Sequence, residues 1–149
     1  MKTVIQRVHS AKVEVDNETV GSIDQGLVIL LGVENGDTQL EGKWLAEKIA
    51  NLRIFQDEHG KMNRTLCSID GSVLIVSQFT LLANCQQGRR PAFTDAAKPN
   101  EANELYLRFI AEFEKLGVRV QTGRFGADMQ LTLTNNGPVT ILLDRNGTS

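Results

Sequence analysis

Residues Leu27–Val33 read LVILLGV, an apolar stretch rich in branched side chains and interrupted only by Gly32. A strand with one solvated face alternates apolar and polar residues, whereas a strand covered on both faces stays apolar throughout. We therefore predict a central strand at these residues. The turn signals Gly21 and Asp24–Gly26 (DQG) precede it, so the chain enters this strand from a loop.

The residues on either side of this strand predict further strands and a helix. Val4, Gln6 and Val8 alternate with Ile5, Arg7 and His9, and Val13 and Val15 alternate with charged or polar neighbours, as in strands. After the central strand, apolar residues recur at three- and four-residue spacing, which predicts a helix over residues 38–53; they are Leu40, Trp44, Leu45, Ile49 and Leu52.

The C-terminal half contains a second alternation of strand and helix. SVLIVSQFTLL (residues 72–82) is strand-like, and strand alternation would place Ser77 and Phe79 on one face and Gln78 and Thr80 on the other. A loop over residues 84–100 is longer than a passive connection needs. A second helix is predicted from Pro99 to Gly117, followed by strands over residues 118–121, 129–134 and 139–143, the last two separated by a turn at residues 135–138.

These elements predict an α+β fold in a single domain over residues 1–149. We expect a mostly antiparallel sheet that closes into a small barrel-like domain with two main helices. Several strands are joined by turns too short to hold a crossover helix, which argues against a doubly wound parallel sheet.

Composition excludes several classes of protein. The 16 basic and 18 acidic residues give a net charge of −2, which argues against a broad basic face that coats nucleic acid. The two cysteines, Cys67 and Cys85, form no Cys-x-x-Cys pair, so neither a disulfide scaffold nor a four-cysteine zinc site is expected. The longest apolar run, Leu27–Leu31, is too short for a membrane span, and we expect a cytoplasmic protein with no membrane contact.

Common catalytic motifs are absent from the sequence. There is no phosphate-binding Gly-x-x-x-x-Gly-Lys-Ser/Thr loop, no Gly-x-Gly-x-x-Gly, no His-Glu-x-x-His and no Gly-x-Ser-x-Gly. The two histidines, His9 in a strand pattern and His59 in a polar turn, show no spacing typical of a triad or of metal ligands. We therefore expect no metal and no cofactor.

Two polar segments stand out. SQFTL (Ser77–Leu81) places two hydroxyls, an amide and a ring at the end of an apolar strand, which fits either a pocket wall or a sheet edge whose hydroxyls bond the backbone. GPVT (Gly137–Thr140) contains the one kind of peptide bond for which cis geometry is cheap, and it fits either carbonyls aimed at a ligand or an ordinary turn.

Together with other stretches, these segments resemble one known family. SQFTL and GPVT in that order, with GLVILLGV (Gly26–Val33), GRRPAFTDAAKP (Gly88–Pro99) and TGRFGADM (Thr122–Met129), are similar to the bacterial-type D-aminoacyl-tRNA deacylases. The resemblance runs from residue 1 to about residue 144. It implies hydrolysis of the ester between a D-amino acid, or glycine on tRNA-Ala, and the 3′ end of tRNA.

The resemblance also implies a homodimer and a set of site residues. A cis Gly137–Pro138 turn would enter the partner's pocket, where its carbonyl oxygens bind the substrate amine and leave no space for an L side chain. Residues of the two motifs and the TGRFGADM stretch would form the catalytic wall and support the pocket; they are Ser77, Gln78, Phe79, Thr80, Phe125, Met129, Val139 and Thr140.

Contacts with the tRNA are expected to be few, because the net charge is negative. The candidate phosphate contacts are Arg89, Arg90 and Lys98, and each of them also fits a solvated loop. Phe79 is equally suited to stacking on the terminal adenine and to packing in the core.

Two mechanisms remain open for the hydrolytic step. Thr80 is a candidate nucleophile, but the SQFTL motif contains no residue able to accept its proton. In the alternative, suggested by the resemblance and favoured here, the ribose 2′-hydroxyl activates water. Gln78 and the backbone N–H groups near Phe79 and Thr80 would then stabilise the oxyanion.

Two other classes of function compete with the esterase. One is a non-catalytic nucleic-acid-binding β domain, which the negative net charge and the single Trp and single Tyr disfavour. The other is a structural dimer in which GPVT is only an interface hairpin. Substitution of Pro138 distinguishes this last possibility from the enzyme. In a structural dimer the substitution would affect only assembly, whereas in the enzyme it would affect the chemistry.

Overall fold

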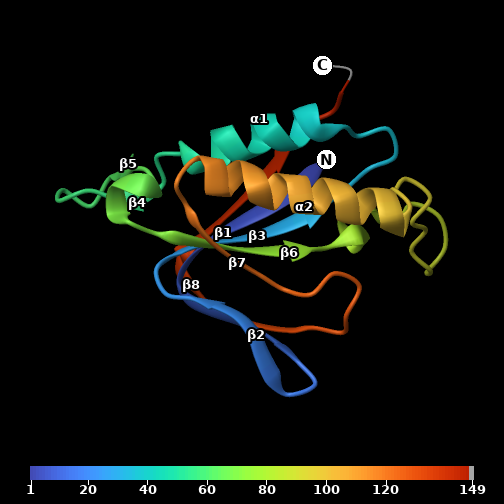
Figure 1. Ribbon diagram of the computed structural model, residues 1–149, viewed down its shortest axis with the longest axis horizontal. Coiled ribbons are helices and arrows are strands. Elements are labelled where there is room, and N and C mark those ends of the chain that lie inside the picture. Colours follow the sequence, from blue (N-terminus) through green and yellow to red (C-terminus); the bar gives the residue numbers. More distant parts are fainter. Residues whose placement is uncertain (148–149) are drawn as a thin grey trace.

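The computed structural model describes residues 1–147. Within this range one six-stranded sheet carries two α-helices on one face, and a two-stranded hairpin lies beside it (Figure 1). The elements in chain order are β1 (Lys2–Val15), β2 (Glu18–Ile23), β3 (Gly26–Gly32), α1 (Gln39–Ala50), β4 (Phe55–Gln56), β5 (Met62–Arg64), β6 (Ser72–Ser77), α2 (Pro99–Lys115), β7 (Arg119–Thr122) and β8 (Gln130–Asp144). Two short 3-10 turns lie at Cys67–Ile69 and Phe79–Leu82.

Strand β1 organises the sheet. The first half of β1 pairs with β3 and the second half with β2, while β8 pairs along the opposite edge, all antiparallel. The β3–β6 and β6–β7 pairs are parallel. The sheet is therefore mixed, and the prediction of a mostly antiparallel sheet is wrong in its second half.

The parallel pairs follow from the lengths of two connections. The chain from β3 to β6 carries α1, and the chain from β6 to β7 carries α2, so both connections are long enough to cross over the sheet. The prediction rested on the short turns of the N-terminal strands, where antiparallel pairing does hold. A Cβ on Gly21 in β2 would lie 2.2 Å from the carbonyl oxygen of Thr122 in β7, so the sheet curls until it nearly closes.

Strand β3 is covered on both faces, as predicted. Leu27, Ile29 and Leu31 are buried in the core that also contains residues of both helices, and Val28 is buried in a second, separate cluster. Helix α2 buries Ala102, Tyr106, Phe109 and Phe113 against the same core.

No helix among residues 1–147 is long and apolar enough to span a membrane.

The turn predicted at residues 135–138 is instead an irregularity inside one long strand. Both halves of β8 pair with β1, and the register shifts between the Gln6↔Thr140 and Val8↔Asn135 pairs. Two steps along β1 therefore correspond to five along β8, so three residues of β8 bulge out of the ladder. The bulge contains Gly137 and Pro138, and the peptide bond between them is cis.

Helix α1 begins with a capping box. The Thr38 side chain accepts from the N–H of Leu40, and the Glu41 carboxylate accepts from the N–H and the hydroxyl of Thr38 at 2.6 and 2.7 Å. Burial raises the pKa of Glu41, but these hydrogen bonds outweigh burial and hold the pKa below its usual value. The carboxylate therefore stays ionised where α1 starts.

Candidate functional site

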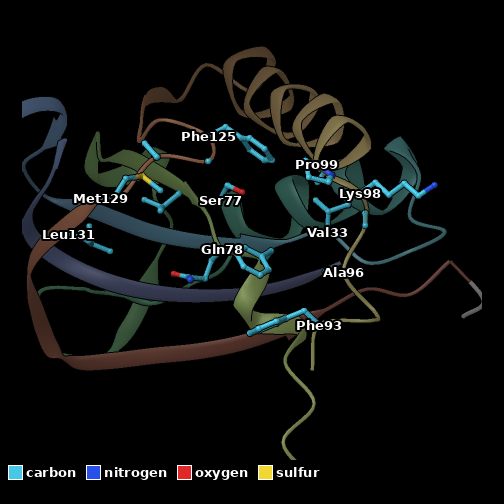
Figure 2. A pocket seen from close by; sticks show the side chains of 16 residues that line it. Val33, Ser77, Gln78, Phe93, Ala96, Lys98, Pro99, Phe125, Met129 and Leu131 are labelled. Carbon is cyan, nitrogen blue, oxygen red and sulfur yellow. The ribbon is translucent and has the colours of Figure 1, made fainter. Parts of the chain in front are cut away.

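A cavity of about 630 Å³ lies where β6 ends and α2 begins (Figure 2). Its walls come from the end of β6 and the following turn, the loop that leads into α2, the loop after β7 and the start of β8. Both β6 and β7 point their carboxyl ends toward it, which is where open sheets with parallel strands commonly bind ligands. The cavity is therefore our candidate site.

Strand β6 stops at Ser77 because the chain turns there. The N–H of Gln78 donates to the carbonyl of Leu31 at 2.8 Å, and a 3-10 turn over Phe79–Leu82 follows. The predicted alternation of faces is wrong as a result, since Ser77, Gln78 and Phe79 all line the cavity. The N–H groups of Phe79 and Thr80 precede the first hydrogen bond of the turn, from the N–H of Leu81 to the carbonyl of Gln78 at 3.2 Å.

Thr80 lies just outside the cavity wall and contacts it through Gln78. The Gln78 side-chain amide donates to the Thr80 hydroxyl. Within residues 1–147 the Thr80 hydroxyl has no other side-chain partner, and an amide N–H₂ group cannot accept a proton. The geometry thus provides a donor group but no base beside Thr80.

Aromatic rings form the rim of the cavity. Phe79 is 55% exposed, which rules out the alternative that it packs in the core, and its ring meets Phe93 edge-to-face at 5.0 Å. Figure 2 shows Phe93 on one side of the cavity and Phe125 with Met129 on the other. Phe93 was missed in the sequence, where an aromatic residue inside a long polar loop was the available signal.

The basic candidates are divided between the cavity and the loop. Lys98 lines the cavity next to Pro99, at the start of α2. Arg89 and Arg90 lie on the exposed part of the loop between the Asn84↔Ala92 bridge residues. Neither arginine has a hydrogen-bonding or charged partner among the described residues.

The GPVT segment lies outside the cavity of its own chain. Gly137 and Pro138 are exposed on β8, and neither they nor Val139 and Thr140 line the cavity. The bulge is closed by Asn135, whose side chain accepts from the N–H of Val139 at 3.0 Å and donates to the Thr140 hydroxyl at 3.0 Å.

A buried arginine supports this bulge from β1. Arg7 is 4% exposed, and its Nε donates to the carbonyl of Asn136 at 3.0 Å while its Nη1 donates to the carbonyl of Ile54 at 2.7 Å. Sequence reasoning gave Arg7 no role. The signal was its place on the inward-facing side of a strand, since Thr3 and Ile5 share that face and are buried.

No His, Asp or Glu is among the described residues that line the cavity. His9 and His59 do not line it, and His59 is exposed beside Glu58. In the described part of the chain no three His, Cys, Asp or Glu side chains are grouped to hold a metal ion.

The chain is similar throughout its length to proteins of known family. The family model described as D-Tyr-tRNA(Tyr) deacylase matches residues 4–144. The D-aminoacyl-tRNA deacylase of Geotalea uraniireducens (strain Rf4) is 56% identical over 144 residues, which are 97% of this chain and 93% of the relative. That of Thermus aquaticus is 55% identical over 97% of this chain and 95% of the relative.

Two solved structures share the fold. One, described as c-Myc DNA Unwinding Element Binding Protein, superposes with a TM-score of 0.92 at 38% identity, covering 99% of this chain and 100% of its own. The other, described as a probable eukaryotic D-amino acid tRNA deacylase, has a TM-score of 0.82 and covers 97% of this chain and 98% of its own. Its identity is 18%, so this second likeness bears on the fold alone.

Proposed function

Because this chain belongs to the D-Tyr-tRNA(Tyr) deacylase family, we propose that it hydrolyses the ester of D-aminoacyl-tRNA to free D-amino acid and tRNA. The observation that carries the proposal is the turn after β6, which brings Ser77, Gln78 and Phe79 together in the wall of the cavity. An acyl-transfer site needs donors aimed at a developing oxyanion, and such a turn supplies them. A cytoplasmic location, where tRNA is used, is part of the same proposal.

The hydrolysis adds water to the ester carbonyl and then expels the ribose oxygen. In our proposal the N–H groups of Phe79 and Thr80, with the Gln78 amide, hold the oxyanion of the tetrahedral intermediate. The neighbouring ribose 2′-hydroxyl of the substrate activates the water and returns the proton to the leaving oxygen. The amide beside Thr80 supports this assignment over a Thr80 nucleophile, because among residues 1–147 no side chain that hydrogen-bonds to this hydroxyl can accept its proton.

Selection of the D-amino acid is proposed to need two chains. Strand β8 pairs only with β1 among the described strands, so its other edge is available for a second copy. In the homodimer, the Gly137–Pro138 bulge of the partner enters the cavity and its carbonyl oxygens accept from the substrate amine. An L side chain would collide with this backbone, whereas a D side chain or the hydrogen of glycine would not, so glycyl-tRNA-Ala is a second proposed substrate.

The exposed aromatic and basic candidates are proposed to contact the 3′ end of the tRNA. Exposed Phe79 and Phe93 offer ring faces and edges to the terminal adenine. Arg89, Arg90 and Lys98 are available to contact acceptor-stem phosphates. Phe125 and Met129 support the cavity, and Val139 and Thr140 hold the bulge.

The first experiment is metal-free hydrolysis of matched D- and L-tyrosyl-tRNA by the purified protein, with Thr80→Ala and Pro138→Ala variants. We expect loss of the D-ester alone, survival of activity in Thr80→Ala and loss of D/L discrimination in Pro138→Ala. Hydrolysis of neither ester above the buffer rate would refute the enzyme and favour a nucleic-acid-binding role. Loss of all activity in Thr80→Ala would restore the nucleophile mechanism.

A further inference from the structure

The cavity opens at a fork between two parallel strands. β6 and β7 pair from Ser72↔Arg119 to Ile75↔Thr122 and then separate. Beyond the last pair, β6 continues to the 3-10 turn over Phe79–Leu82, and β7 continues into the loop that carries Phe125. The width of the cavity therefore depends on where and how firmly the two strands part.

One carbonyl group occupies this branch point. The carbonyl of Ile75 accepts from the N–H of Gly123 at 3.2 Å and from the hydroxyl of Tyr106 at 3.0 Å. The first of these bonds belongs to the strands, and the second comes from α2, which packs above them (Figure 1). The branch point is thus fixed from two directions.

Tyr106 is the only tyrosine in the chain, and it lies 3% exposed behind the cavity. Burial raises its pKa to about 12, and a hydrogen bond with the Thr122 side chain opposes part of that rise. The phenol therefore keeps its proton at physiological pH and remains a donor to the Ile75 carbonyl. A single hydroxyl contacts both β6 and β7 at their last paired residues.

The ring of Tyr106 has a second contact that reaches the cavity directly. It packs against Phe125 with ring centroids 5.9 Å apart and planes tilted by 44°. Figure 2 shows the Phe125 side chain beside α2, across from Gln78. The same residue therefore fixes the strand that leads to Gln78 and supports the ring on the opposite wall.

We infer that Tyr106 is a positioning residue of this site, whose hydroxyl sets the separation of β6 and β7 and whose ring holds Phe125 against the substrate. The inference rests on the proposed function for its kinetic consequence, but its structural consequence stands apart from it. Tyr106 is not among the residues that line the cavity, so it acts on how the substrate is held more than on the chemical step.

The test compares Tyr106→Phe with Thr3→Val. Both remove a buried hydroxyl that donates to a strand carbonyl, because Thr3 donates to Leu143 at the far end of β8. In Tyr106→Phe we expect the Gly123 amide to exchange about 2–10-fold faster and KM for D-tyrosyl-tRNA to rise by a similar factor, the range typical of one hydrogen bond. We expect kcat to change less than KM, and Thr3→Val to leave Gly123 exchange and KM unchanged.

Unchanged Gly123 exchange and KM in folded Tyr106→Phe would overturn the inference, and so would an equal rise of KM in Thr3→Val. If Tyr106→Phe does not fold, Thr122→Val removes the second partner of the phenol and must raise Gly123 exchange for the inference to stand. A non-hydrolysable amide analogue, 3′-deoxy-3′-(D-tyrosylamino)adenosine, separates this test from the proposed function. Weaker binding of this analogue by Tyr106→Phe supports the inference even if the wild-type protein cleaves no ester.

Discussion

Arg7 is the residue whose replacement tests how the bulge is held. A lysine has one ammonium group in place of a planar fork, so Arg7→Lys cannot donate to both the Asn136 and Ile54 carbonyls in the same geometry. Hydrogen bonds to charged groups contribute about 1.5–3 kcal/mol each. We expect a fall of about 2 kcal/mol in the free energy of unfolding and a lower D/L ratio of hydrolysis.

Arg53→Lys is the matched control for this change, because Arg53 donates to Asn63 on the exposed surface. It should leave both the unfolding midpoint in urea and the D/L ratio as in the wild type. A wild-type D/L ratio in Arg7→Lys would show that the bulge keeps its shape without the guanidinium.

Gln78 is the residue on which the oxyanion assignment depends. Removal of one oxyanion donor typically lowers kcat by about 10²–10³-fold. We expect a loss of that size for Gln78→Ala in single-turnover hydrolysis of D-tyrosyl-tRNA, with little change in stability because the side chain is partly exposed. A single-turnover rate of Gln78→Ala equal to that of the wild type would show that Gln78 does not stabilise the oxyanion.

The start of α1 makes the free energy of unfolding depend on pH. The pKa of Glu41 is lower in the folded chain than its usual value, so its contribution is complete above the unfolded pKa of about 4.3. The contribution is lost as the pH falls through the folded pKa. We expect Glu41→Gln to flatten the acid limb of the unfolding free energy measured by urea titration.

Thr38→Ala serves as the companion variant, because loss of an N-cap costs about 1 kcal/mol. The free energy of unfolding of Thr38→Ala should be lower than that of the wild type at neutral pH as well as at acid pH. An acid limb in Glu41→Gln as steep as that of the wild type would assign the pH dependence to other carboxylates.

The sequence predicted most helices and strands, because their periodicity is local. Two of its failures lie where long-range contacts decide the local structure. SQFTL has the composition of a strand, but the Leu31 carbonyl takes the N–H of Gln78, and Gly32 leaves room for Leu82, so the chain turns there. Residues 135–138 have the composition of a turn, but pairing with β1 on both sides keeps them inside β8.

The candidate site was predictable to the extent that its residues lie in short motifs. Ser77, Gln78, Phe79, Phe125 and Met129 line one cavity, while their roles in catalysis stay predictions. Tyr106, Arg7 and Phe93 could not be placed, because α2, β1 and the loop reach the site only through the fold.

For the whole molecule, the proposed dimer makes a prediction that a monomeric site cannot satisfy. If the pocket takes Gln78 from one chain and Pro138 from its partner, mixed dimers of Gln78→Ala and Pro138→Ala contain one pocket with both residues intact. Random exchange of subunits makes about one quarter of all pockets wild type, so we expect about one quarter of the wild-type excess of D-ester over L-ester hydrolysis to return. Sedimentation measures the dimer, and the hydrolysis assay measures the recovery.

The hydrolysis measured with each variant alone, taken through the same exchange procedure, gives the baseline of this experiment. Recovery no greater than the average of the two baselines, in a mixture shown to exchange subunits, would place Gln78 and Pro138 in the same chain's site or would remove one of them from it.

The pairing of β1 with β8 also affects how the protein is made. Lys2 lies opposite Asp144, so β1 can complete this pairing only after β8, the last of the described strands, has been synthesised. While the chain is still on the ribosome, one edge of β1 stays open, and contacts between such distant residues form slowly. We expect the nascent chain to depend on chaperones until β8 has emerged from the exit tunnel.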